Sequence, residues 1–199
     1  MRFVRHAVVV AVGLLFMAGL APPASGTADV IVVKDFDFTP AAYAGILGGA
    51  VQWDNNVGPS MHEPVQDAPL NLWKRPVINV GSSSTPINLF DVGTFAYHCA
   101  IHPFMHGTVQ VPVTTNISTG SVGDVIRINV ATQAHPNFTF DVARKIGSGT
   151  WTTFKTGVTH DWVTMRANAA GTYRFKALLV RIRTKAVSGW SPSAAVTIS

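Results

Sequence analysis

Short runs of β-branched and aromatic residues recur along the chain, and glycine, proline, asparagine and serine separate them. Apolar runs of this length between turn residues are typical of β-sandwiches. Apolar residues seldom recur at helical spacing, and we find no convincing capped helix of ten residues. The strands expected in the first half are Val30–Lys34, Ala50–Trp53, Val77–Val80, Ile87–Phe90, Thr94–Cys99 and Gly107–Val111.

The strand pattern stops at a stretch rich in threonine, asparagine and proline, and then restarts. About seven short strands over about 80 residues match a single immunoglobulin-like sandwich. The pattern therefore predicts an all-β chain of two sandwiches, at 27–112 and 118–199, joined by a linker at 113–117. The strands expected in the second half are Val125–Ala131, Phe138–Arg144, Trp151–Lys155, Asp161–Met165, Thr172–Arg183 and Ala194–Ile198.

The first 26 residues have the pattern of a secretory signal peptide. A basic start at Met1–His6 precedes an apolar run at Ala7–Leu20, and small residues follow at Ala24–Gly26. The apolar run is shorter than the about 20 residues that a membrane-spanning helix needs. We therefore expect an exported protein without a transmembrane segment, located in the periplasm, outside the cell or on the cell envelope.

The two predicted sandwiches differ in charge. Residues 27–113 carry 3 basic and 7 acidic side chains, whereas residues 114–199 carry 10 basic and 3 acidic ones. Alternation along the last long strand predicts a basic stripe at Arg181, Arg183 and Lys185. This stripe is either a solvated face or a surface for an anionic cell envelope or an acidic redox partner. Nucleic acid is not expected as the partner of an exported protein.

A thiolate, an imidazole and a thioether lie within seven residues, at Cys99, His102 and Met105. Cys99 is the only cysteine, so it has no disulfide partner within an exported chain; a buried small side chain or an intermolecular disulfide is the alternative role. Two histidines, one cysteine and a weak axial methionine are the ligand set of electron-transfer copper sites. His62 is the only histidine between residues 27 and 97 and is the candidate second imidazole. Zinc could occupy the same Cys-His-His set.

The first half contains Phe38-Thr39-Pro40, Val51–Asn55, Gly93–Cys99, Gly107–Val109 and the stretch Cys-x-x-His-Pro-Phe-Met that begins at Cys99. In these motifs it resembles the cupredoxin family, and its ligand loop resembles that of amicyanin. The resemblance implies a Greek-key β-sandwich with one type 1 copper ion, which carries single electrons by cycling between Cu(I) and Cu(II). It also implies that His62, Cys99, His102 and Met105 are the copper ligands. Many members have asparagine after the first histidine ligand, where this chain has Glu63.

Apolar residues near the two candidate histidines predict a small docking surface for a redox partner around His102. Weak redox encounters use small interfaces of this kind. The alternative is that Phe104 packs inward. The residues concerned are Pro59, Met61, Pro103 and Phe104.

The second half resembles a fibronectin type III module. The matching stretches are Ala170–Ala177, in which Tyr173 is the expected corner tyrosine, and Ser188–Ser193. We expect this basic module to dock the protein or to localise it.

Catalysis is not expected. The chain has no His-x-His motif, which multicopper oxidases would need, and no nucleophile elbow or phosphate loop. His98, which alternates with Cys99, is expected to point away from the metal, and His106 corresponds to no ligand of the family. Two other functions remain open. One is a copper delivery or buffering protein that does not cycle, and the other is a cell-surface interaction protein that uses the fold as a scaffold.

Overall fold

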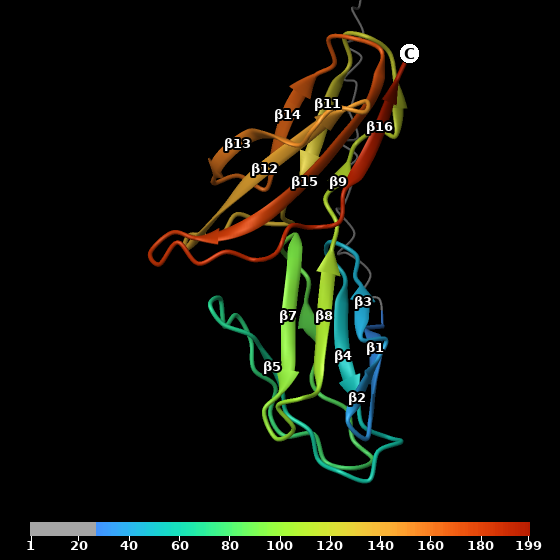
Figure 1. Cartoon of the computed structure of the whole chain (residues 1–199), viewed down its shortest axis with the longest axis vertical. Helices are drawn as coiled ribbons and strands as arrows, with labels where there is room; N and C mark the ends of the chain where they lie inside the picture. Colours follow the sequence, from blue (N-terminus) through green and yellow to red (C-terminus); the bar gives the residue numbers. More distant parts are fainter. Residues whose placement is uncertain (1–26) are drawn as a thin grey trace, which may run out of the picture.

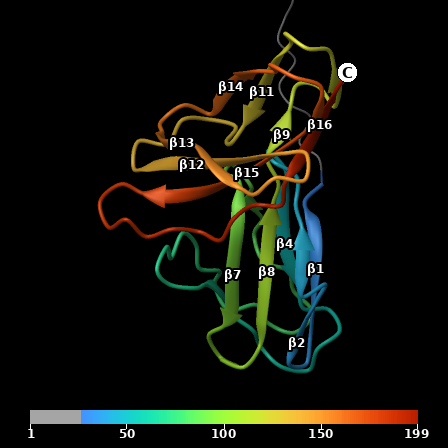
Figure 2. The same ribbon diagram turned by 45° about the horizontal axis from the view of Figure 1, so that its top comes forward.

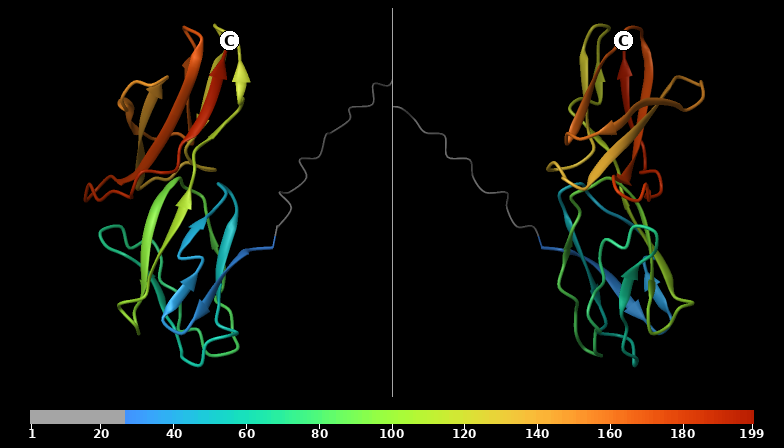
Figure 3. Two further views of the ribbon diagram at one scale, coloured as in Figure 1. Left: turned by 45° about the vertical axis from the view of Figure 1, so that its right-hand side comes forward. Right: turned by 90° about the vertical axis from the view of Figure 1, so that its left-hand side faces the viewer.

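The computed structural model describes residues 27–199. All the helices and strands assigned within these residues are β-strands. The predicted signal peptide at 1–26 lies outside the described residues. The strands form two pairs of sheets, which lie end to end along the long axis of the molecule (Figures 1 and 3). Within residues 27–199, no helix has the length and apolar character needed to cross a membrane.

The first sandwich consists of one sheet in the order β2-β1-β4-β6 and a second in the order β3-β8-β7-β5. Alternate residues of each strand face the interior, so that Val51 and Trp53 of β4 lie opposite Phe95 and Tyr97 of β7 in the core. The strands are β1 (Asp29–Lys34), β2 (Asp37–Thr39), β3 (Ala42–Ala44), β4 (Ala50–Asp54), β5 (Pro64–Gln66), β6 (Ile87–Asn88), β7 (Gly93–Cys99) and β8 (His106–Val111).

Most of the expected strands of the first half are present, with one exception. Val77–Val80 is irregular apart from a single bridge between Ile78 and His62. Proline and glycine flank this segment, and both interrupt strand pairing. Strands β2, β3 and β5 have three residues each, which is too short for an alternating pattern to reveal them.

The second sandwich consists of a sheet in the order β10-β16-β15-β12-β13 and a smaller one in the order β14-β11-β9. The Tyr173 hydroxyl donates a hydrogen bond to the Ala169 carbonyl at 2.8 Å, which is the contact of a tyrosine corner. The strands are β9 (Thr114–Thr115), β10 (Thr119–Gly120), β11 (Val125–Asn129), β12 (Phe138–Ile146), β13 (Thr152–Val158), β14 (Trp162–Arg166), β15 (Gly171–Arg181) and β16 (Ala194–Ile198). Strand β9 pairs with β11, so the stretch at 113–117, expected to be a linker, contains a strand of the second sandwich.

The predicted basic stripe is wrong, because β15 ends at Arg181. Arg183 and Lys185 lie in the turn that follows, where Lys185 has a positive φ of 60°. Arg181 itself donates a hydrogen bond to the Leu70 carbonyl of the first sandwich at 2.6 Å, and its guanidinium lies 4.8 Å from the centre of the Phe138 ring.

Main-chain hydrogen bonds join the two sandwiches. Thr94 and Gly189 exchange a pair of N–H···O bonds at 3.0 Å each, and the Thr94 hydroxyl donates to the Trp190 carbonyl at 2.8 Å. A side chain at Gly189 would place its Cβ 3.0 Å from that of Thr94, so glycine permits this close approach. The joint lies beside the first residues of β7 (Figure 2).

Strand β7 therefore determines how far the Cys99 end lies from the second sandwich. The strand begins at the joint and ends at Cys99, and five residues at about 3.3 Å each separate Thr94 from Cys99 by about 17 Å. The loop between β7 and β8 consequently lies at the end of the molecule opposite the second sandwich (Figure 1).

Candidate metal centre

The loop that carries three of the predicted ligands is closed by its own main chain. Cys99 is the last residue of β7, and its N–H donates to the Met105 carbonyl at 3.1 Å. The His102 N–H donates to the Cys99 carbonyl at 3.1 Å, and the Met105 N–H donates to the His102 carbonyl at 2.9 Å. These turns fold the segment back on itself and bring the side chains of Cys99 and His102 together.

His62 lies in a second loop, which hydrogen bonds also hold in place. Its N–H and carbonyl both pair with Ile78, at 3.1 and 2.7 Å. The buried amide of Asn55 donates to the carbonyls of Ser60 and Ile78, at 2.8 and 3.1 Å. The His62 side chain is fully buried as a result.

The structure brings His62, Cys99 and His102 together around one point. Cys99 Sγ lies 3.7 Å from Nδ1 of His62 and 3.7 Å from Nδ1 of His102, and the two nitrogens are 3.3 Å apart. A metal with bonds of about 2.0–2.3 Å to nitrogen and sulfur, in tetrahedral to trigonal geometry, separates its ligand atoms by about 3.3–3.8 Å. The donor spacing therefore fits a single metal ion, and the soft thiolate beside two imidazoles fits copper in a type 1 site.

Burial favours the protonation state that binds a metal. Desolvation lowers the pKa of His62, and the nearby His102 lowers it further, against a smaller opposing effect of Asp35. Imidazole ligates in its neutral form. His62 is thus held as a neutral donor.

Met105, the predicted fourth ligand, is buried next to this group in sequence and in space. Its main chain bonds to both Cys99 and His102, which places it in the same loop closure. Whether its thioether is an axial ligand stays a prediction.

Glu63 replaces the asparagine expected after the first histidine, and its main chain connects the two loops. The Glu63 N–H donates to Cys99 Sγ at 3.3 Å, and the Ala100 N–H donates to the Glu63 carbonyl at 2.8 Å. Its carboxylate pairs instead with Lys74, at 2.9 Å. An N–H donor to a thiolate sulfur stabilises the charged form and tunes the potential of the metal that it binds.

His102 lies among aromatic side chains at the surface. Its ring is 5.2 Å from that of Phe36, in an edge-on arrangement, and 6.1 Å from that of Phe104. Phe104 is 65 % exposed and Phe36 is 53 % exposed, so Phe104 does not pack inward. Sequence reasoning missed Phe36, which contacts this loop from the β1–β2 turn and has a positive φ of 62°, an unusual conformation for a large residue.

His98, expected to point away from the metal, pairs with Asp67, and His106, which corresponds to no ligand of the family, lies outside the donor cluster. His98 Nδ1 lies 2.5 Å from Asp67 Oδ1, on the outer face of β7, and the exposed His106 ring lies 6.3 Å from that of His98. Within residues 27–199, the group of three or more side chains that could hold a metal ion consists of His62, Cys99 and His102.

No protein-family model matches the chain, and no curated protein matches it either. Solved structures of cupredoxins are similar over less than half of it. A reduced Cu(I) form of an amicyanin mutant is 24 % identical, with 45 % of this chain and 86 % of that chain covered and a TM-score of 0.40. A purple cupredoxin from Nitrosopumilus maritimus is 21 % identical, with 42 % and 98 % covered and a TM-score of 0.38.

Proposed function

We propose that this chain is an exported type 1 copper protein that carries single electrons and is not an enzyme. The observation that supports the proposal most is the approach of His62 Nδ1, Cys99 Sγ and His102 Nδ1 to within 3.3–3.7 Å of one another. Two imidazole nitrogens that face each other at 3.3 Å with a sulfur beside them are arranged to share one cation.

A bound copper ion would supply a one-electron Cu(I)/Cu(II) couple at this donor set. The chain would hold the donors in one arrangement for both oxidation states. Asn55 fixes the His62 loop, and the Glu63 N–H fixes the sulfur of Cys99. A rigid ligand set needs little rearrangement on electron transfer, and this lowers the barrier.

The surface around His102 supports transient docking of a redox partner. Phe36 and Phe104 flank the imidazole and are more than half exposed. The second sandwich lies at the opposite end of the molecule and leaves this face open (Figure 1). Its excess of basic residues suits it to bind an anionic surface of the cell envelope.

The test is to load the chain that begins at residue 27 with Cu(II) and to follow it through a reduction and reoxidation cycle. We expect an intense visible absorption from thiolate-to-copper charge transfer, which disappears on reduction and returns on oxidation. Cys99→Ser should abolish the absorption. The matched control His98→Asn changes the neighbouring residue on the outer face and should keep it.

A colourless complex, or one that cannot be reduced reversibly, would overturn electron carriage. A complex that binds copper tightly without cycling would indicate a delivery or buffering protein instead. Retention of the colour in Cys99→Ser would show that the ligand assignment is wrong.

A further inference from the structure

Two histidines outside the candidate metal centre face each other across β7 and β8, which lie side by side (Figure 1). His98 and His106 are directly opposite in the register of this antiparallel pair, so both side chains lie on the same face of the sheet. That face is the outer one, because the neighbouring Cys99 points into the core and successive residues of a strand alternate. The pair therefore lies on the opposite side of β7 from the Cys99 sulfur.

The position of this pair in the ladder brings the two side chains close together. One residue further along, the Cys99 N–H donates to the Met105 carbonyl. Hydrogen-bonded and non-hydrogen-bonded pairs alternate along an antiparallel ladder, and side chains are closer in the second kind. His98 and His106 therefore form a non-hydrogen-bonded pair, in which the Cα atoms are about 4.5 Å apart and the Cβ atoms about 4.5–5.5 Å apart.

The separation of the two imidazole rings is one that a single metal ion can bridge. The ring centres of His98 and His106 are 6.3 Å apart. An ion bonded to each ring nitrogen at about 2.0–2.1 Å lies about 3.2 Å from each ring centre, so the centres of two rings on one ion are about 5–6.4 Å apart. The observed separation is at the upper end of this range. Because the His106 side chain is exposed, its ring can turn toward His98 without disturbing the core.

Asp67 holds the His98 ring in the orientation that metal binding requires. Its Oδ1 lies 2.5 Å from His98 Nδ1, and its N–H donates to the Ala96 carbonyl of β7 at 2.9 Å, which keeps the residue beside the strand. A neutral His98 that donates through Nδ1 keeps a lone pair on Nε2. A carboxylate on the other ring nitrogen is the usual partner of a metal-binding histidine, because it fixes the tautomer and makes the free nitrogen a stronger donor.

The pair is open to solvent, in contrast to the buried donors His62 and Cys99 of the candidate metal centre. The side chains of His98 and Asp67 are 33 % and 31 % exposed, and His106 is exposed. An ion can therefore reach both imidazoles without a change in the fold, and water can supply its remaining ligands.

We propose that His98 and His106 bind a divalent transition-metal ion, with Asp67 as the residue that positions the His98 ring. Imidazole nitrogens suit Zn²⁺, Cu²⁺ and Ni²⁺. The ion would lie on the outer face of β7. The proposal is independent of electron carriage, because neither His62 nor Cys99 takes part in it.

The test is an NMR titration of the ¹⁵N-labelled chain that begins at residue 27 with Zn²⁺, in which the histidine ring nitrogens are observed. Zinc also suits the Cys-His-His donor set, so the first equivalent should shift His62 and His102. Further zinc should shift the ring nitrogens of His98 and His106 together. No shift of these two rings at about 1 mM free zinc, which half-fills a site with a Kd of about 1 mM, would overturn the proposal. A shift of His106 alone would show a lone surface imidazole and would also overturn it.

Variants separate the pair from the metal centre. His106→Gln keeps a polar side chain and removes one of the two ligands, so it should weaken the second zinc ion at least tenfold and leave the first unchanged. Cys99→Ser should weaken the first zinc ion and keep the shifts of His98 and His106. His160→Gln changes an exposed histidine of the second sandwich and is the matched control, which should bind both ions like the wild type. Wild-type binding of the second ion by His106→Gln would contradict the assignment.

A further variant tests the role of Asp67. Asp67→Asn keeps the size of the side chain and removes its charge, so it should weaken the second zinc ion about tenfold. It should also move the His98 proton partly from Nδ1 to Nε2 in the zinc-free chain, which the same ring nitrogen spectra detect. Unchanged affinity together with an unchanged tautomer would show that Asp67 does not position His98.

Discussion

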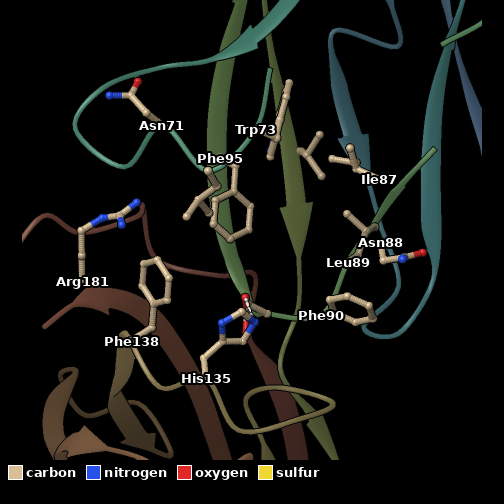
Figure 4. Close-up of a pocket in the computed structure, with 13 residues that line it drawn as sticks. Asn71, Trp73, Ile87, Asn88, Leu89, Phe90, Phe95, His135, Phe138 and Arg181 are labelled. Atoms are coloured by element: carbon tan, nitrogen blue, oxygen red, sulfur yellow. Dashed lines mark ion pairs between the residues drawn. The ribbon is translucent and has the colours of Figure 1, made fainter. Parts of the chain in front are cut away.

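The two ends of the first sandwich are made by the same strands, yet they leave different groups unpaired. At the far end, the donor atoms of His62, Cys99 and His102 lie 3.3–3.7 Å apart and main-chain bonds fix both loops. At the joint, Asp91 and His135 face each other at 3.5 Å beside a cavity of about 480 Å³. The far end brings three donor atoms to one point, whereas the joint leaves a cavity beside an ion pair (Figure 4).

The difference arises at the ends of the strands rather than in the core. Strands β7 and β8 alternate inward residues along their whole length, so one sandwich core reaches both ends. The far end closes because a short loop folds back through its own hydrogen bonds. The joint stays open because residues of a second sandwich, rather than a continuous loop, cover it.

The largest expected effect is the gain in stability on metal binding. A metal that binds only the folded chain raises the free energy of unfolding by about 2.7 kcal/mol at a free concentration of 100 Kd. We expect this gain with zinc, which is redox-inert, and we expect Cys99→Ser to lose most of it. Asp91→Asn, at the joint, should retain it. Chemical unfolding of each variant with and without zinc measures the gain in unfolding free energy. Equal gains in Cys99→Ser and Asp91→Asn would mean that the metal does not bind at the Cys99 end.

The next effect compares two inward positions of β8. A Cβ at Gly107 would clash with the buried Tyr97 ring, so Gly107→Ala should cost about 1–3 kcal/mol of unfolding free energy by overpacking. Val109 borders the cavity, so we expect Val109→Ile to be accommodated more easily and to cost less. Urea unfolding of both variants decides this, and an equal loss would mean that the two ends are packed alike.

A smaller effect concerns docking. Electron self-exchange requires two copies to meet at the His102 surface, and Phe104→Asp places like charges on both. We expect the exchange rate to fall about tenfold while the visible absorption stays the same. Phe90→Asp alters an exposed phenylalanine at the joint and serves as the control. NMR line broadening in mixtures of the Cu(I) and Cu(II) forms gives the rates, and an equal decrease in both variants would exclude docking at His102.

The smallest effect is on the pH dependence of stability. Burial raises the pKa of Asp91, so the folded chain holds this proton to higher pH than the unfolded chain does. The contribution of Asp91 to the free energy of unfolding is therefore greatest below its unfolded pKa of about 3.9 and falls as the pH rises through the folded value. Relative to the wild type, Asp91→Asn should gain stability as the pH rises from about 4 in urea unfolding experiments. A loss of stability in Asp91→Asn relative to the wild type would mean that the attraction of His135 outweighs the effect of burial on the pKa of Asp91.

The sequence was sufficient to predict what depends on local spacing. Cys99, His102 and Met105 lie within one loop, so their spacing alone predicts a common centre. His62 followed from the shortage of other histidines in the first half. The long strands were predictable because their inward and outward residues alternate.

What depends on tertiary contact could not be predicted in this way. Phe36 reaches His102 from a distant turn, and the Glu63 N–H that bonds to the sulfur belongs to the main chain, so side-chain identity does not reveal it. The cavity depends on how the two sandwiches meet. Arg181 turns inward to Leu70 and Phe138 because its strand ends there, which the pattern of charges could not show.

X-ray absorption at the copper edge is the sharpest test of whether Cys99 and two histidines share one copper ion. We expect one short copper–sulfur contact and two copper–nitrogen contacts in the wild type, with the sulfur contact absent in Cys99→Ser. A wild-type spectrum with only nitrogen and oxygen neighbours around copper would contradict it.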